Sequence, residues 1–212
     1  MKLYDFLSPS HDEVKKMLGN VLPEDLSQKT MLDLASGEGT HLAFFFDKKI
    51  KEISVVDQNT EGLNKLFERY RGYGSNITLI NADVLSFKYN NIFDLVYLGD
   101  NSIQIFNTYS DQYKIIDIIA KSLKTDGVAV INITLIVEEN ILKFNNEYKL
   151  ISDEGDEPLQ GKIKVDIFNQ ELVYYFINGT ETRTIRTRIL LRKELEEMVD
   201  SVGLVISKVS MY

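Results

Sequence analysis

The 212-residue sequence contains no cysteine and only two histidines. Without cysteine the protein cannot form disulfide bonds, bind a metal ion through thiolates or use a cysteine nucleophile. Two histidines argue against a dedicated zinc site, which normally takes three or four protein ligands. The composition therefore directs the search for function away from metal and thiol chemistry.

Long apolar segments are also missing. The first five residues (MKLYD) lack the apolar core of a signal peptide, and no run approaches the length needed to cross a bilayer. We therefore expect no membrane association and a cytoplasmic location.

Basic residues are outnumbered by acidic ones, 24 against 32, which gives a net charge of −8. Proteins that bind nucleic acids normally present a basic face that displaces counterions, so we expect no nucleic-acid partner. A small molecule or a peptide is the expected substrate. The length and the 44% hydrophobic content suit one well-formed core, so we expect a single domain over residues 1–212.

Strand and helix patterns alternate between residues 30 and 135. The near-continuous apolar runs at 93–98 and 128–131 are typical of parallel strands that are covered on both faces. The alternation predicts an α/β fold, a doubly wound and mostly parallel Rossmann-like sheet. The expected strands are 30–35, 52–57, 77–82, 93–99 and 127–135, and the expected helices are 40–48, 60–71 and 110–124.

The two ends of the chain follow different patterns. Residues 1–27 predict a helical lid or docking segment, with a helix that begins at the capping box Ser10–Glu13 and ends at Gly19 and Asn20. Within 137–190 we expect an inserted antiparallel meander of three strands after a polar loop at 137–161, with a hairpin turn at Asn178–Gly179. Such strands are a candidate homodimer surface. The remaining expected elements are the strands 163–167, 172–177 and 180–190, a helix 191–202 closed by Gly203, and a strand 204–209.

Residues 31–40 (MLDLASGEGT) are the most informative segment. An apolar strand runs into a glycine loop and then into a helix, so backbone N–H groups and the positive end of the helix dipole face one spot. Asp57 ends the next strand, where its two oxygens can accept both hydroxyl protons of a ribose. This combination predicts an adenosine-containing ligand.

The details of the loop discriminate between cofactors. A dinucleotide motif requires a third glycine, whereas Gly37 and Gly39 are followed by Leu42. Asp33 in the first strand would repel a pyrophosphate and suits a cationic or amine-bearing ligand. A nicotinamide dehydrogenase is therefore the weaker alternative.

The motif resembles that of the class I S-adenosylmethionine-dependent methyltransferases, a strand ending in Asp-x-(Gly/Ala)-x-Gly-x-Gly. The matching residues are Asp33, Ala35, Gly37 and Gly39. The resemblance implies an enzyme with S-adenosyl-L-methionine as cofactor and S-adenosyl-L-homocysteine as product. In a doubly wound sheet the ligand lies beyond the carboxyl ends of the strands. The expected cofactor-binding residues are Asp33, Ala35, Ser36, Gly37, Gly39, Asp57, Gln58, Asp83, Val84, Leu98, Gly99 and Asp100.

Asp83 and Val84 are expected to meet the adenine, through its amino group and a ring nitrogen. An ordinary Asx turn is the structural alternative for Asp83.

Segments 33–40 and 98–102, with the inserted strands, resemble the glycine and sarcosine N-methyltransferases and the related aminosugar N-methyltransferases. Where the glycine enzymes carry an arginine for the substrate carboxylate, residues 133–136 (ITLI) are apolar, so glycine itself is not the expected substrate. The family's seventh strand has no evident counterpart, so we expect a shorter sheet or another segment at that edge.

The resemblance implies methyl transfer to an amine nitrogen of a small molecule or peptide. The sulfonium already activates the methyl group, so the protein mainly has to orient a neutral amine and exclude water. Asn101, Ser102 and Tyr4 are the candidates for that role. An O-methyltransferase or a non-catalytic cofactor-binding module remains an alternative.

An oxygen nucleophile would need a base, but His11 and His41 are expected to be surface or cap residues. A second group of side chains concentrates basic charge in this acidic chain. We expect these basic side chains to lie on a solvent-exposed strand face, and binding of an anionic substrate is the alternative. These residues are Arg183, Arg186, Arg188, Arg192 and Lys193.

Overall fold

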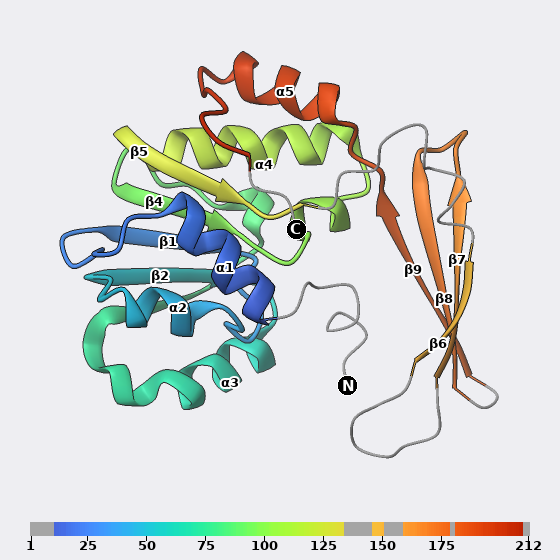
Figure 1. Ribbon diagram of the computed structural model, residues 1–212, viewed down its shortest axis with the longest axis horizontal. Coiled ribbons are helices and arrows are strands. Elements are labelled where there is room, and N and C mark those ends of the chain that lie inside the picture. Colours follow the sequence, from blue (N-terminus) through green and yellow to red (C-terminus); the bar gives the residue numbers. More distant parts are fainter. Residues whose placement is uncertain (1–10, 134–145, 151–158, 179–180, 210–212) are drawn as a thin grey trace.

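The computed structural model describes residues 11–133, 146–150, 159–178 and 181–209 (Figure 1). Its main body is a five-stranded parallel sheet in the order β3-β2-β1-β4-β5. The strands are β1 (Thr30–Leu34), β2 (Glu52–Asp57), β3 (Ile77–Asn81), β4 (Phe93–Leu98) and β5 (Leu123–Ile131). The helices are α1 (His11–Val21), α2 (Leu42–Asp47), α3 (Thr60–Tyr70), α4 (Tyr109–Ser122) and α5 (Arg192–Ser201). The expected doubly wound fold is confirmed; α1 continues through Gly19 and Asn20, where an end was expected.

Helices cover both faces of the sheet, with α4 and α5 on one face and α1, α2 and α3 on the other (Figure 1). Alternate residues of each strand enter different cores, because successive side chains point to opposite faces. Leu32 and Leu34 pack with α4 and α5, whereas Met31 packs with α1, α2 and α3. Asp33 therefore points to the same face as Met31, beneath the first three helices.

The strand order places β1 between β2 and β4. The chain leaves β1 toward one edge of the sheet and later crosses to the other edge at β4. Such a reversal separates the loops that follow the two strands and leaves a crevice at their carboxyl ends, where open α/β sheets bind ligands. The topology thus puts the loops after β1 and β4 at the expected ligand site.

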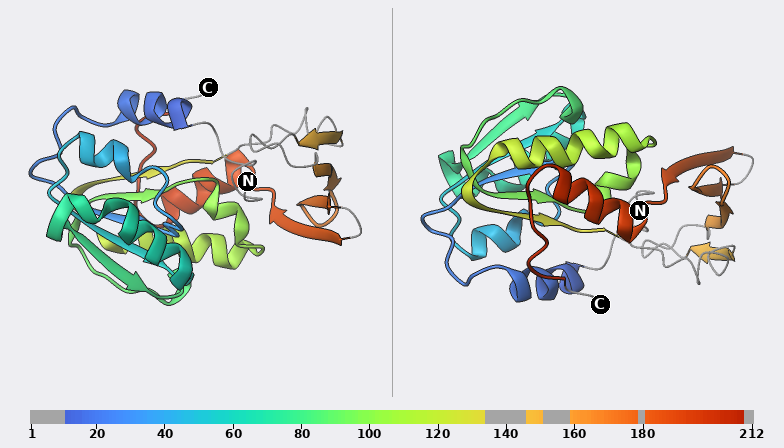
Figure 2. Two further views of the ribbon diagram at one scale, coloured as in Figure 1. Left: turned by 90° about the horizontal axis from the view of Figure 1, so that it is seen from below. Right: turned by 90° about the horizontal axis from the view of Figure 1, so that it is seen from above.

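A second, antiparallel sheet stands on the side of the core to which β5 points (Figures 1 and 2). It has four strands in the order β6-β7-β8-β9, where three were expected. The additional strand β6 pairs with the start of β7, inside the range expected to be a polar loop. The hydrophobic pattern gives no signal for β6, because a polar strand at the edge of a sheet is held by backbone hydrogen bonds and does not need alternating apolar residues. The strands are β6 (Asn146–Leu150), β7 (Leu159–Asp166), β8 (Glu171–Asn178) and β9 (Glu181–Arg188).

Arg188, the last residue of β9, ties this sheet to the main body. Its guanidinium donates to both carboxylate oxygens of Glu194 at 2.7 and 3.1 Å and to the side-chain oxygens of Gln112 and Gln170, both at 2.8 Å. Arg188 is only 7% exposed, so the expectation of a solvated basic face is wrong for this residue. The expectation fits Arg186, which is about half exposed and pairs with Glu171.

The expected strand at 204–209 is not formed. Gly203 takes a φ of +77°, its N–H donates to the carbonyl of Asp200, and the N–H of Leu204 donates to the carbonyl of Val199. This pair of bonds is a Schellman cap, which turns the chain back along α5. The cap confirms the expected role of Gly203. It also explains the error, because the chain leaves the helix without pairing to the edge of β5.

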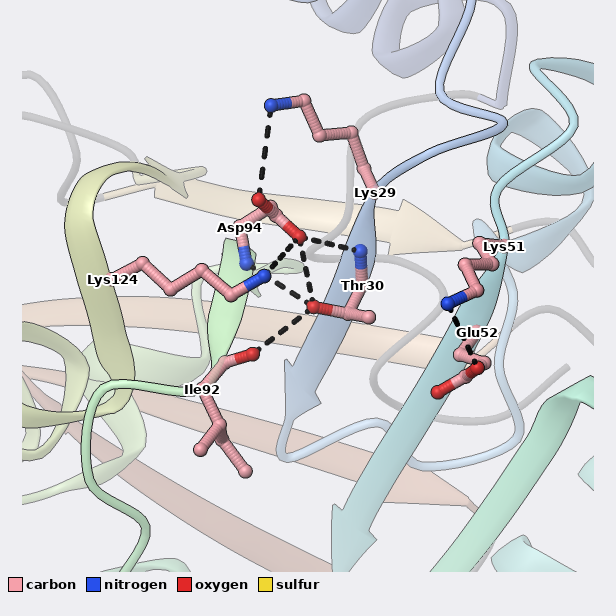
Figure 3. Close-up of polar contacts among 7 residues, drawn as sticks. All are labelled: Lys29, Thr30, Lys51, Glu52, Ile92, Asp94 and Lys124. Carbon is pink, nitrogen blue, oxygen red and sulfur yellow. Dashed lines mark hydrogen bonds and ion pairs between the residues drawn. The ribbon is translucent and has the colours of Figure 1, made fainter.

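At the amino ends of the strands, opposite the loops after β1 and β4, the side chain of Asp94 links neighbouring strands (Figure 3). Its carboxylate accepts hydrogen bonds from the N–H and hydroxyl of Thr30, each at 3.0 Å, and from Nζ of Lys124 at 2.8 Å. Burial alone would raise the pKa of Asp94, but the bonds from Lys124 and Thr30 outweigh it and hold this pKa well below its usual range. The carboxylate therefore links β1, β4 and β5 in its ionised form.

Replacing Asp94 with asparagine is expected to lower the free energy of unfolding at neutral pH by about 1–2 kcal/mol. Because the pKa of Asp94 is lower in the folded state, its ionised carboxylate stabilises the fold at pH values above 3.8, the pKa of an aspartate in the unfolded chain. The difference between wild type and variant should therefore shrink as the pH falls below about 4. Urea unfolding at several pH values measures it. Glu52→Gln is the control, because its pair with Lys51 is solvent-exposed and should change stability by less than about 0.5 kcal/mol.

Candidate active site

The loop between β1 and α2 takes a left-handed backbone at three positions. The φ angles are +54° at Ala35, +54° at Gly37 and +69° at Gly39. Glycine adopts such angles without penalty, whereas alanine does so at a cost that usually marks a constrained site. The N–H of Ser36 donates to the carbonyl of Val56 at 3.2 Å, which fixes the loop against β2.

Glycines also allow α3 to approach this loop closely. A Cβ on Gly39 would lie 2.8 Å from the side chain of Leu66, and one on Gly62 would lie 3.1 Å from the carbonyl oxygen of Gly37. The hydroxyl of Tyr70 donates to the carbonyl of Gly39 at 2.8 Å. Close helix packing, which the third glycine provides in dinucleotide motifs, is here supplied by Gly62 from a separate helix.

Asp57 ends β2 beside the glycine loop. Its Oδ2 accepts from the N–H of Gly37 at 2.8 Å and its Oδ1 accepts from the N–H of Asn59 at 2.7 Å. A carboxylate has about four acceptor positions, so each oxygen retains capacity for a further donor such as a ribose hydroxyl. Asp57 thus shapes the loop in addition to its expected role as an acceptor.

Negative charge converges on this point. Asp33 is buried, and its pKa is raised well above the usual value by that burial and by the charges of Asp100 and Asp57. A cationic ligand beside these three carboxylates would favour the ionised form of Asp33 and be attracted by it. The electrostatics suit a ligand with positive charge, as the position of Asp33 in the sequence predicts.

The loop after β4 is a tight turn. The N–H of Ser102 donates to the carbonyl of Gly99 at 2.9 Å, and the two residues between them, Asp100 and Asn101, have φ angles of +52° and +56°. Positive φ at both central positions defines a type I′ turn, for which aspartate and asparagine are favoured. Ser102 is buried and Asp100 half-buried, so this is not the fully exposed polar turn considered as the alternative.

The loop after β3 lies next to Asp57, because the N–H of Ala82 donates to the carbonyl of Asp57 at 3.1 Å. The carboxylate of Asp83 accepts from the N–H of Leu85 at 2.9 Å, which is the Asx turn considered as an alternative. Asp83 and Gln58 are exposed, and Val84 is buried. The expected adenine and ribose residues therefore lie together at neighbouring strand ends, and Tyr4 lies outside the described residues.

His41 was expected to be a surface or cap residue. It stands at the N-cap position of α2, as the second alternative predicts, but its side chain is buried and makes no capping bond. The imidazole is 5% exposed, with Nδ1 3.0 Å from the hydroxyl oxygen of Tyr97 and Nε2 3.5 Å from Oδ1 of Asp100. Sequence reasoning missed this contact because 56 residues separate His41 from Tyr97.

Asn132, directly after β5, was also missed. Its N–H donates to the carbonyl of Leu98 at 2.9 Å, which places it beside the turn after β4. The side chain is 1% exposed, and its Oδ1 has no hydrogen-bond partner; the same holds for the buried Oγ of Ser36 after β1. Buried polar atoms are normally paired, so these two are candidates for ligand contacts. The position of Asn132 after an apolar strand was the available indication.

A surface groove of about 410 Å³ lies elsewhere, between α5 and residues 204–209. It is formed by one helix and the chain segment that follows it, away from the strand ends. The groove therefore has no part in the site described above.

Comparison with known proteins agrees with the site. Residues 31–127, from β1 into β5, match the family model of a methyltransferase domain. A search of curated proteins gives no significant match.

Several solved structures share the fold. A S-adenosylmethionine-dependent methyltransferase from Clostridium acetobutylicum aligns with a TM-score of 0.70 at 20% identity, covering 93% of this chain and 80% of that one. The amino pentose methyltransferase CalS10 from Micromonospora echinaspora, solved with its cofactor, gives 0.66 at 14% identity, covering 96% and 84%. A sugar N-methyltransferase from a Streptoalloteichus species gives 0.63 at 17% identity, covering 95% and 84%.

The domain match, the sheet order and the glycine loop with its paired aspartate agree with the class of protein that the sequence motif resembles. Residues 31–127 carry a methyltransferase domain, and the chain has the fold of S-adenosylmethionine-dependent methyltransferases of known structure. The domain match supports an enzyme with S-adenosylmethionine as its cofactor. Among the described residues no helix is long and apolar enough to span a membrane.

Proposed function

We propose that this enzyme transfers a methyl group to an amine nitrogen of a small molecule, with a peptide amine as a variant. The observation that carries the proposal is the convergence of Asp33, Asp57 and Asp100 at the ends of β1, β2 and β4. These carboxylates favour cationic groups, which the cofactor and an amine acceptor both offer. The structural similarity to a sugar N-methyltransferase and an amino pentose methyltransferase adds support.

The residues present fit the cofactor. Asp57 retains acceptor capacity for ribose hydroxyls, and the buried Oγ of Ser36 needs a partner that the methionine end can supply. Asp33 and Asp100 would lie near the positively charged end, and Asp83 and Val84 near the adenine. The backbone of Ala35, Gly37, Gly39, Leu98 and Gly99, together with Gln58, would complete the binding surface.

The cofactor supplies an electrophilic methyl group, so the protein needs no acid–base triad. Asn101 and Ser102 follow the strand end directly and can orient the nitrogen lone pair toward that group. Tyr4 is proposed for the same role from the sequence alone. Asp100 sits in the same turn and can accept a hydrogen bond from an ammonium or amine. Holding the two reactants in line, away from water, is then the main source of acceleration.

A paired acceptor assay tests the proposal. Titration calorimetry with S-adenosylhomocysteine first establishes cofactor binding. Methyl transfer is then measured by mass spectrometry with an amino sugar and with the same sugar bearing a hydroxyl in place of the amine. We expect methylation of the amine only. Methylation of the hydroxyl analogue alone would favour an O-methyltransferase, and cofactor binding without turnover on broad acceptor panels would favour a non-catalytic module.

A further inference from the structure

His41 occupies a buried position between the core and the turn after β4. Its two ring nitrogens face different groups: Nδ1 is 3.0 Å from the hydroxyl of Tyr97, and Nε2 is 3.5 Å from Oδ1 of Asp100. Both rings are almost fully buried, at 5% exposed for His41 and 2% for Tyr97. The orientation of the imidazole is therefore set by these partners rather than by solvent.

The chemistry of the partners selects one tautomer. Nε2 lies at ion-pair distance from Asp100, and an ionised carboxylate repels a lone pair and attracts an N–H group, so this contact favours the tautomer with the proton on Nε2. In a neutral imidazole Nδ1 is then an acceptor, and it takes the hydroxyl proton of Tyr97. The hydroxyl of Tyr97 thus donates to His41, whose N–H side faces the carboxylate of Asp100.

The neighbouring backbone accommodates this arrangement. A Cβ on Gly99 would lie 2.6 Å from the hydroxyl oxygen of Tyr97, so glycine is needed for the tyrosine to reach His41. Asp100 and Asn101 both hold left-handed angles, which persist only where surrounding contacts enforce them. His41 contacts this turn at Asp100.

We propose that His41 is a positioning residue, which holds the carboxylate of Asp100 in the orientation that meets the ammonium group of the bound cofactor. The inference rests on the proposed placement of S-adenosylmethionine at this site. The other charged groups that bear on the same point are Asp33 and Asp57, from β1 and β2. His41 itself does not touch the reacting atoms and acts through Asp100.

Calorimetry with S-adenosylhomocysteine, which carries the same ammonium group, tests the role. His41→Phe fills the buried space but presents no N–H group to Asp100, and we expect the loss of this polar contact to raise Kd about tenfold. His41→Gln can donate through its amide and should restore Kd to within about threefold of wild type. A phenylalanine variant that binds as tightly as wild type, or a glutamine variant as weak as phenylalanine, would overturn the inference. Failure of the wild type to bind would instead contradict the proposed function.

Nuclear magnetic resonance provides a readout that does not depend on the His41 variants folding. The chain has two histidines, so His11→Gln assigns the signals of His41 directly. Long-range ¹⁵N spectra of the wild type at neutral pH should show His41 protonated at Nε2 and unprotonated at Nδ1. A proton on Nδ1, alone or in an imidazolium, would refute the positioning arrangement. In Tyr97→Phe the Nδ1 signal should shift, because it loses its donor.

Discussion

The Asp57→Ala variant is expected to bind S-adenosylhomocysteine more weakly by about 1.5–3 kcal/mol, roughly a 10- to 150-fold increase in Kd. The variant loses the acceptor proposed for the ribose. It also loses the carboxylate that accepts from the N–H groups of Gly37 and Asn59, so the glycine loop is less well fixed. Titration calorimetry measures the change.

Two control variants separate these contributions. Asp57→Asn keeps one acceptor oxygen and nearly the same shape, so we expect an intermediate Kd. Glu61→Gln alters an exposed residue at the start of α3 that pairs with Lys65, and binding should be unchanged. An Asp57→Ala variant that is folded by circular dichroism and has the wild-type Kd would contradict the ribose assignment.

Arg188→Met is expected to cost about 3–5 kcal/mol of stability, the range for breaking a buried ion pair from one side. Methionine replaces much of the aliphatic volume but leaves the carboxylate of Glu194 and the oxygens of Gln112 and Gln170 without their donor. The guanidinium also lies 5.6 Å from the ring centroid of Tyr109, a cation–π contact that is lost. Chemical unfolding, followed by circular dichroism, measures the loss.

Arg186→Met is the matched control on the same face of β9. Its partner Glu171 is 2.7 Å away, but the arginine side chain is 52% exposed, so solvent screens the pair. We expect a change of less than about 1 kcal/mol. If the two variants lost equal stability, Arg188 would not be the link between the second sheet and the main body that the structure indicates.

The predictable elements were those determined by local pattern. The parallel strands and their helices follow from continuous apolar runs and helical periodicity, and the glycine loop from residues close together in the chain. The aspartate that ends β2 is also predictable, because parallel strands end at a common edge. Gly203 as a helix cap belongs to the same group, since its effect is confined to a few residues.

The errors share a different origin. Arg188 was expected on a solvated face and His41 as a surface or cap residue, but both side chains are buried and contact Gln112 and Tyr97, which are distant in sequence. The fourth antiparallel strand was missed because a polar edge strand has little hydrophobic signature. Residues 204–209 have the composition of a strand but do not pair with the edge of β5.

The order of residues along the chain alone determined the doubly wound sheet and the glycine loop and predicted a cationic adenosine ligand, because each depends on short-range spacing and side-chain chemistry. Tertiary structure alone decided which polar groups meet and which of them are buried: Asp33 beside Asp57 and Asp100, His41 between Tyr97 and Asp100, and Arg188 against Glu194. Burial is a property of the packed molecule, since it depends on which distant segments exclude water from a side chain. Burial raises the pKa of Asp33, and it gives Arg188 a structural role between the second sheet and the main body.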